Sequence, residues 1–392
     1  MFNLLFWKKP KNNLNILFVM AFFLALAGAL PAYIQSSYLE TFVGLSAVNW
    51  FFIIANSISI LAILFFPRLI KKLGNYLTTG FVSLLFLASL LGMGLTTNIF
   101  LIFLFFITLQ ISINLIWINM DIFVENFSNN STTGQTRTIY FTVINLAWII
   151  SPSLAAWIID LQGYAGSFLM SALLIIPFII IFLLKAKKIK SSVTYSHSSF
   201  TKSLKEMYQN HNLRGIFWLA MLLNVFFNAT TVFIPIYLNR VVGFTWVELG
   251  LMFSIMLLPF LFIEIPAGII ADKYLGEKEM LALGYLIMII CLCLFFTSNS
   301  VNFWFWTALL FVSRIGAALV EAMRESYFFK NVCAKDVEKI NIFRTTIPIG
   351  YLFGSLLSLV VLIFLPMSYI FPITAIILCS AFPFLAIIKD TR

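Results

Sequence analysis

The sequence predicts an all-α integral membrane protein whose twelve transmembrane helices form two pseudo-symmetric six-helix bundles. The 392 residues are 61% hydrophobic and only 10% charged, with a mean hydropathy of +1.01. Soluble domains are about half apolar and about a quarter charged. The 25 basic and 15 acidic side chains are too few to cover a water-exposed surface of this size, so a lipid bilayer must cover the rest.

Apolar runs of membrane-spanning length recur along the whole chain. A helix needs about 20 mostly apolar residues to cross the hydrocarbon core. Such runs predict six helices in the first half, at residues 14–34, 46–66, 77–96, 99–120, 138–160 and 167–184. Six more follow at residues 215–238, 248–270, 279–297, 301–322, 341–365 and 369–388.

One polar stretch divides these runs into two sets of six. Residues 185–214 are basic and rich in serine and contain no long apolar run, so they predict a cytoplasmic linker. We therefore expect one bundle in residues 1–184 and a second in residues 215–392. Residues 200–208 have mild helical amphipathicity and lie either on the membrane surface or in a solvated connector.

The basic residues predict the orientation of the chain. With the N-terminus inside, all of the 25 Lys and Arg except Arg240 and Arg314 lie in cytoplasmic segments or, like Arg344, in the cytoplasmic first turn of a predicted span. The even number of helices then places both termini in the cytoplasm. Residues 27–29 resemble a signal-peptide cleavage site, but cleavage there would remove a helix that has a counterpart in the second half. We expect a multi-pass protein of the cell membrane.

The charges and the reactive side chains exclude several classes of function. The net charge of +10 lies between apolar runs, which indicates topology and not nucleic-acid binding. The four cysteines give no disulfide framework, and both histidines lie in the linker, so we expect no metal and no cofactor. No phosphate-binding Gly-x-x-x-x-Gly-Lys-[Ser/Thr] loop is present, so ATP is not the expected energy source.

The two halves repeat short patterns in the same order. The run Pro31-Ala32-Tyr33-Ile34-Gln35 ends the first helix of its half, and Pro235-Ile236-Tyr237-Leu238-Asn239 ends the corresponding helix of the second. A second match follows in Gly44-Leu45-Ser46 and Gly243-Phe244-Thr245. These matches support two related halves.

The loop between the second and third helices of the second half has the most specific motif. It reads Gly268-Ile269-Ile270-Ala271-Asp272-Lys273-Tyr274-Leu275-Gly276-Glu277-Lys278. This run resembles the Gly-x-Leu-Ala-Asp-Arg-x-Gly-Arg-Lys signature of the major facilitator superfamily, with one inserted residue. The first copy departs from it, because Pro67 replaces the glycine and Lys71 replaces the aspartate.

Two further stretches resemble motifs of the same family. Residues 314–318 resemble an arginine-glycine motif. In the helix at 138–160, Ala147, Ser151-Pro152 and Ala155-Ala156 resemble an antiporter motif. Close helix packing explains these small residues equally well.

The family resemblance implies a secondary active transporter that moves a small solute by alternating access around a site near the bilayer midplane. It also implies a cytoplasmic latch that involves Gly268, Asp272, Lys273 and Gly276. Arg137 and the positive end of the following helix would attract Asp272. Coupling to protons and an efflux direction are both compatible with this interpretation. The substrate stays unidentified, and we expect a monomer in the lipid bilayer without nucleic acid.

Polar side chains predict where the substrate cavity lies, because the resemblance implies that the first and fourth helices of each half line it. In the helix at 99–120, Gln110, Asn114, Trp117 and the following Asp121 lie within about 60° of one another. In the helix at 215–238, the residues with the same spacing are Asn224, Asn228 and Thr231. Packing between helices through these amides is the alternative interpretation.

Two ionisable residues lie well inside predicted spans, namely Glu264 and Arg314. Charges within a membrane are costly, so each needs a partner or a water-filled cavity. Their similar depth allows a structural ion pair, and a role in coupling or substrate binding is the alternative. If transport is proton-coupled, Glu264 is the candidate that loads and releases the proton.

Two other classes of function compete with transport. An integral-membrane enzyme would need clustered acidic, histidine or metal-binding groups, and only Asp121 and Glu125 come close together in the first half, so we do not expect an enzyme. A receptor that uses a transporter scaffold without transport is also compatible with the sequence, because a fold does not fix a function.

Overall fold

The protein is all-helical over the residues that the structure, a computed structural model, describes, which are 12–127, 133–185, 200–332 and 336–389. The first part of the chain forms α1 (Asn12–Ala32), α2 (Gln35–Val43), α3 (Leu45–Leu95), α4 (Ile99–Phe127) and α5 (Thr133–Lys185). The short helix α6 (Phe200–Gln209) lies between this part and the next. No strand is present in the described ranges.

The second part has more and shorter helical elements. They are α7 (His211–Asn228), η3 (Ala229–Phe233), α8 (Ile234–Tyr237), η4 (Leu238–Val242), α9 (Trp246–Met256), α10 (Leu258–Phe262), α11 (Glu264–Ile270), η5 (Ala271–Leu275), α12 (Glu277–Thr297), α13 (Phe303–Asn331), α14 (Val337–Arg344), α15 (Thr346–Phe364), η6 (Met367–Tyr369), α16 (Ile370–Cys379) and α17 (Ala381–Ile387). The turns η3, η4 and η5 are π-helical. The turn η3 continues α7 into α8, whereas Gly243 ends η4 and Gly276 ends η5.

Side-chain caps fix the starts of three helices in the second part. Asn210 accepts hydrogen bonds from the backbone of Asn212 and Leu213 at the start of α7. At the start of α9, Thr245 and Glu248 form a reciprocal capping box. Asn302 caps α13 in the same way as Asn210 caps α7. These caps satisfy backbone N–H groups that have no partner within the helix.

Ten helical segments of the described chain are long and apolar enough to cross a membrane. Two of them are far longer than one crossing requires. Helix α3 has 51 residues, which is about 75 Å at the rise of an α-helix, whereas the hydrocarbon core is about 30 Å thick. Gly74 interrupts α3 with a φ of 79°, and Gly163 interrupts α5 with a φ of 69°. Glycine suits these positions because it adopts positive φ without a Cβ clash.

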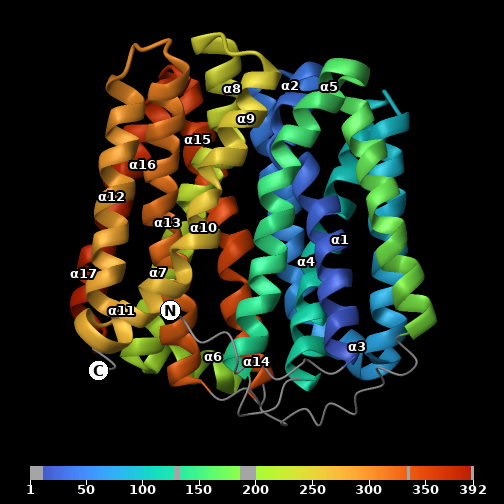
Figure 1. Cartoon of the computed structure of the whole chain (residues 1–392), viewed down its shortest axis with the longest axis vertical. Helices are drawn as coiled ribbons and strands as arrows, with labels where there is room; N and C mark the ends of the chain where they lie inside the picture. The colour runs from blue at the N-terminus through green and yellow to red at the C-terminus, as the bar shows by residue number, and fades with distance from the viewer. Residues whose placement is uncertain (1–11, 128–132, 186–199, 333–335, 390–392) are drawn as a thin grey trace, which may run out of the picture.

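The first and second parts of the chain lie side by side (Figure 1). Helix α5 packs against α9, and α3 packs against α15, so both contacts join the two parts. The labels of α2, α8 and α9 lie near the upper end of the molecule, and those of α6 and α14 lie near the lower end (Figure 1). The molecule therefore has an upper end and a lower end, and helices from both parts of the chain lie at each of them.

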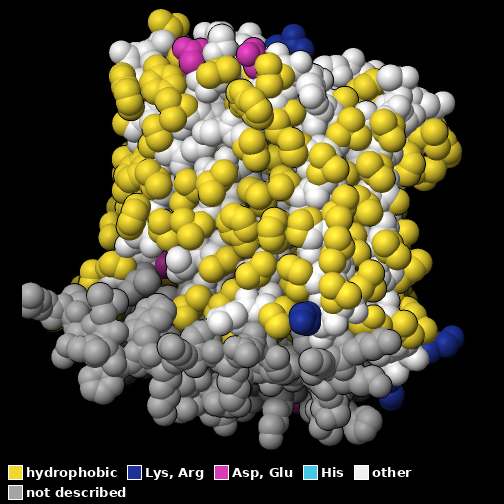
Figure 2. Space-filling view, turned by 45° about the vertical axis from the view of Figure 1, so that its right-hand side comes forward, with side chains coloured by type: hydrophobic (Ala, Val, Ile, Leu, Met, Phe, Trp, Pro, Cys, Tyr) yellow, Lys and Arg dark blue, Asp and Glu magenta, His cyan; other side chains and the backbone are white. Residues whose placement is uncertain are grey.

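The surface of the molecule has the pattern of a membrane protein. Figure 2 shows apolar side chains over the middle of one face, with acidic and basic side chains at its upper edge. Large exposed apolar residues include Phe81, Leu95, Trp157 and Phe364. A soluble protein rarely exposes so many, and a bilayer covers them without cost. The chain is thus a multi-pass membrane protein.

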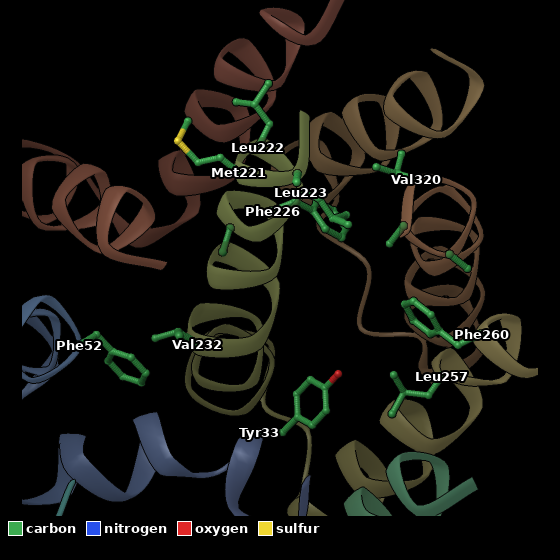
Figure 3. Packing of buried hydrophobic residues seen from close by; sticks show 14 of the residues in the cluster. Tyr33, Phe52, Met221, Leu222, Leu223, Phe226, Val232, Leu257, Phe260 and Val320 are labelled. Carbon is green, nitrogen blue, oxygen red and sulfur yellow. The ribbon is translucent and has the colours of Figure 1, made fainter. Parts of the chain in front are cut away.

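The core is a continuous apolar cluster that crosses between the two parts of the chain. Figure 3 shows Phe52 of α3 opposite Val232 of η3 within this cluster. Tyr33, from the junction of α1 and α2, lies near Leu257 and Phe260 of the second part. Among the largest fully buried side chains, Arg314 is the exception to this apolar character.

Candidate functional site

The charged residues of α13 form a stripe on one face of that helix. Arg314, Glu321 and Glu325 follow at steps of seven and four residues, which keeps them within about 40° of one another. The sequence predicts Glu264 as the only carboxylate well inside a span, and it predicts that this helix ends at residue 322, just after Glu321. In the structure α13 continues to Asn331, so Glu321 and Glu325 also belong to a long apolar helix. The i, i+7, i+11 spacing was the signal that could have found them.

Arg314 lies near the middle of α13 and is 1% exposed. Its Nη1 donates a hydrogen bond of 2.8 Å to Oγ1 of Thr230 in η3. The centre of its guanidinium group is 5.4 Å from the Phe226 ring and 5.5 Å from the Phe227 ring. These distances allow cation–π attraction, which stabilises a desolvated guanidinium. The end of α7 therefore fixes the position of this buried charge.

Glu264 lies at the start of α11 and is partly buried. Its carboxylate interacts with the Asn145 side chain of α5, whose Nδ2 also donates a 3.1 Å hydrogen bond to the carbonyl of Phe260. The charged groups that act on it are Glu321 and Glu325. Among the described residues, no ion pair joins Glu264 to Arg314. The two charges at similar depth thus do not neutralise each other here.

The lower end of the molecule has a charge cluster that joins the two parts of the chain. Arg344, in α14, binds both carboxylate oxygens of Glu325 at 2.7 and 3.2 Å. Its Nη2 also lies 3.4 Å from Oδ2 of Asp121, which belongs to α4. We call Asp121, Glu325 and Arg344 the lower charge cluster. Arg324 lies next to it, 3.5 Å from Glu321 and 3.9 Å from Glu325.

A second contact at the lower end joins α14 to the short helix α6. Lys339 lies 3.0 Å from Glu206 and 3.5 Å from Asp336. The hydrogen bond and the charge of Lys339 hold the pKa of Glu206 below its usual range. The amphipathic segment that the sequence placed at 200–208 is therefore tied to α14.

The upper end has contacts between the parts as well. Nε of Arg240, in η4, lies 3.6 Å from Oε2 of Glu40 in α2. The rings of Tyr164 and Trp246 meet edge to face at a centroid distance of 5.4 Å. These contacts join residues from both parts of the chain at the upper end.

The small residues of α5 pack closely against α9. A Cβ atom on Gly250 would lie 2.9 Å from the carbonyl oxygen of Pro152, so only glycine fits there without a shift. The hydroxyl groups of Ser153 and Ser254 are 2.7 Å apart. These contacts favour the packing interpretation of the small-residue pattern.

The polar residues predicted on α4 point to several different neighbours. Nε2 of Gln110 donates a 3.1 Å hydrogen bond to Oε1 of Gln35 at the start of α2. Nδ2 of Asn114 donates to the carbonyl of Gln110 in its own helix. Trp117 packs against an apolar cluster that includes Ala25 and Ala147. These side chains are partly buried, and α4 brings them toward α1, α2 and α5.

The polar residues predicted on α7 lie mainly against α15. Nδ2 of Asn228 donates a 3.0 Å hydrogen bond to Oγ of Ser355, and Asn224 packs against Gly350. This arrangement favours amide-mediated packing for these two residues. Thr231, in η3, is 7% exposed and interacts with Tyr33 and Tyr351. The sequence does not indicate Tyr33 or Tyr351 as site residues, because a tyrosine in an apolar run carries no periodic signal.

The proposed latch lies only partly within the described residues. Gly268 belongs to α11, and a Cβ atom there would meet no atom within 4 Å. Gly276 ends η5 with a φ of 95°. The side chains of Asp272, Lys273 and Arg137 lie outside the described residues. The described residues contain no group of three His, Cys, Asp or Glu side chains that could hold a metal ion.

Three comparisons with known proteins identify relatives of this chain. The profile of the Major Facilitator Superfamily matches residues 14–332 and 247–392. An uncharacterized MFS-type transporter of Schizosaccharomyces pombe is 23% identical over 220 residues, and the chain spans about half the length (49%) of this curated relative. The crystal structure of a POT family transporter in complex with 5-aminolevulinic acid has a TM-score of 0.75 at 15% identity, and the match covers 95% of each chain.

Proposed function

Because this chain belongs to the Major Facilitator Superfamily, we propose that it is a secondary transporter that moves a small solute across a membrane by alternating access. One structural observation supports this function most directly. The buried charge of Arg314 on α13 lies between contacts that join the two parts of the chain at both ends of the molecule. A permanent structural role would not need charges enclosed at the centre of a membrane protein, where they are costly.

The proposed architecture has twelve spans in two halves. The ten long helical segments become twelve if α3 and α5 each fold back at the glycine with positive φ. The first half then comprises residues 1–184, the linker residues 185–214 and the second half residues 215–392. The close structural relative supports this layout, because its fold matches over nearly the whole chain.

The proposed location is the cell membrane, with both termini in the cytoplasm. The basic residues between the spans favour this orientation. A hydrogen bond supports placing the linker on the same side as the C-terminus. The backbone N–H of Lys389 donates to Oδ1 of Asn212, which lies in the linker range at the start of α7. In this orientation the lower charge cluster is cytoplasmic and the Glu40–Arg240 pair is on the outer side.

The transport cycle that we propose uses these two contacts as gates. Glu40 and Arg240 separate when the outer side opens, and Asp121 and Arg344 separate when the cytoplasmic side opens. The solute binds between them, near Thr231 and Arg314, and Gln110, Asn114 and Trp117 line the side of the first half. The structural relative with a bound small molecule supports a small-molecule solute.

Proton coupling is assigned to Glu264 in this proposal. Its carboxylate lacks a described basic partner, and acidic side chains act on it, so a proton would relieve the repulsion. Release of that proton on one side of the membrane would couple transport to a pH gradient. Both uptake and efflux are compatible with this arrangement.

The test is a screen of small solutes in proteoliposomes with and without an imposed pH gradient. We expect Glu264→Gln to abolish gradient-driven transport and to spare exchange, because glutamine cannot carry the proton. The control is Glu279→Gln, which changes an exposed glutamate in α12. Unchanged gradient-driven transport by Glu264→Gln would leave Glu264 a structural role. No movement of any solute would favour the receptor or enzyme alternatives.

A further inference from the structure

Arg314 differs from Arg324 and Arg344, two other arginines of its half, in the groups that lie around it. Arg324 is 4% exposed and has Glu321 and Glu325 within 4 Å. Arg344 binds Glu325 and Asp121. Arg314 has no carboxylate within ion-pair distance among the described residues, and its one hydrogen bond goes to a neutral hydroxyl. A fully buried positive charge without an acidic partner is costly, so a partner from outside the chain would stabilise it.

The unpaired part of the Arg314 guanidinium has a definite shape. Nη1 donates to Thr230, whereas Nε and Nη2 are buried and have no hydrogen-bond partner in the part of the chain that the structure describes. Nε and Nη2 lie on the same edge of the planar group, so their two N–H bonds point in parallel. This edge matches the two oxygens of a carboxylate and binds them with two hydrogen bonds.

The surroundings of this free edge come from both halves of the chain. Phe226 and Phe227, from the end of α7, face the guanidinium group. Tyr33, from the first half, is close enough to interact with Arg314 and with Thr231. Figure 3 shows the Tyr33 hydroxyl directed toward the region between Phe226 and Phe260. Aromatic rings around a charge exclude water, which strengthens a hydrogen bond formed there.

We propose that Arg314 binds the carboxylate group of the transported solute through the Nε–Nη2 edge of its guanidinium. The Tyr33 hydroxyl contacts the same end of the solute from the first half. A carboxylate held in this way would supply the missing partner of the buried charge, and both halves would close around it. This inference rests on the proposed transport function and adds the chemical class of the substrate.

The first test needs no ligand and compares two buried arginines of one helix. In purified full-length protein, Arg314→Met should keep the melting temperature of the wild type or raise it, because the substitution removes an uncompensated charge. Arg324→Met is the matched control and should lower the melting temperature, because it removes the arginine that lies 3.5 Å from Glu321 and 3.9 Å from Glu325. A fall for Arg314→Met as large as that for Arg324→Met would overturn the inference, since it would show a structural role.

The second test uses carboxylate probes and their neutral counterparts. The melting temperature is measured with each carboxylate at about 10 mM (alanine, lactate or benzoate) and with each matching amide (alaninamide, lactamide or benzamide). A ligand raises the melting temperature because it stabilises the state that binds it. We expect at least one acid to raise the melting temperature and its amide to leave the melting temperature unchanged. Arg314→Gln and Arg314→Lys should weaken this binding about tenfold or more, because neither keeps the bidentate fork.

Several results of the second test would overturn the inference. An acid and its amide could raise the melting temperature equally, or inorganic phosphate could raise it while none of the acids does. The acids could also leave the melting temperature unchanged, or the rise caused by an acid could persist in Arg314→Gln. Each would show that Arg314 does not select a carboxylate.

Uptake in proteoliposomes separates this inference from the proposed function. If the stabilising acid binds the wild type through Arg314 but is not taken up, the transport proposal fails and the assignment of the carboxylate site stands. If the wild type takes up the acid and Arg314→Gln does so at the same rate, transport stands and the assignment of Arg314 fails. We expect uptake by the wild type and a loss of at least about tenfold in Arg314→Gln.

Discussion

Arg240 and Glu40 meet across the two halves of the chain, with Nε of the arginine 3.6 Å from Oε2 of the glutamate. The two residues follow the repeated Pro-x-Tyr patterns of the first and second halves, so related segments approach each other at the upper end of the molecule. The side chain of Arg240 is 59% exposed, and that of Glu40 is 16% exposed. Exposure weakens the attraction, which suits a contact that must break in each transport cycle.

We predict that Arg240→Glu opens the outer side and that the exchange Glu40→Arg with Arg240→Glu restores the wild-type behaviour. The single change places like charges opposite each other, whereas the exchange rebuilds the pair. The probe is Ser254→Cys on a background without native cysteines, because Ser254 contacts Ser153 at the junction of the halves. An impermeant thiol reagent should react about two- to fivefold faster in the single variant, as expected for a pair worth up to about 1 kcal/mol. Equal rates in all three proteins would show that this pair does not gate.

The lower charge cluster should contribute more to stability than the outer pair, because Arg344 is 14% exposed and has two acidic partners. We predict that Arg344→Met lowers the free energy of unfolding by about 2–4 kcal/mol, since it leaves Glu325 and Asp121 unpaired. Arg344→Lys should cost less but should not match the wild type, because lysine lacks the planar fork.

Unfolding of the purified variants in detergent measures these differences. The control is Arg68→Met, which changes an exposed arginine that lies over the Phe65 ring and should cost less than about 0.5 kcal/mol. Similar stability of Arg344→Met and Arg68→Met would contradict the importance of the cluster.

Close packing between α7 and α15 gives a third prediction. A Cβ atom on Gly350 would lie 2.7 Å from the carbonyl oxygen of Met221, and backbone cannot give way as a flexible side chain does. We expect Gly350→Ala to destabilise the protein by about 1–3 kcal/mol. Gly268→Ala is the matched control, because its Cβ atom would meet no atom within 4 Å. Thermal unfolding of both variants tests the difference, and a stable Gly350→Ala protein would contradict this packing.

The cytoplasmic latch gives the fourth prediction. If Asp272 attracts the start of α5, Asp272→Asn should favour the state that is open to the cytoplasm. Thiol reagents added from that side should then react faster with a cysteine in the cytoplasmic mouth, by about fivefold for a contact worth about 1 kcal/mol. Lys71→Asn is the control, because Lys71 takes the place of the aspartate in the first copy of the motif. If Asp272→Asn and the wild type react at the same rate, the latch proposal fails.

Much of the site could not be predicted from the sequence, and Asn228 shows why. Its spacing with Asn224 and Thr231 fitted a cavity face, but its amide binds Ser355, which is 127 residues away along the chain. Glu321 was missed for a different reason: it lies at the end of the span predicted at 301–322, whereas α13 continues to Asn331 and places it inside the helix. Helix ends and contacts between distant helices depend on neighbours that a local pattern does not contain.

The sequence by itself determined that the chain enters a membrane, where its apolar helices lie, and which family it resembles. Transfer of a helix into lipid depends on the local sum of side-chain hydrophobicities, so it can be read along the chain. Only the tertiary structure decided that Arg344 meets Asp121 and Glu325, while Arg314 has no carboxylate within ion-pair distance among the described residues. The pairing of charges depends on distances of a few ångströms between helices, because the attraction falls with separation and with access of water, and neither quantity is contained in the order of residues.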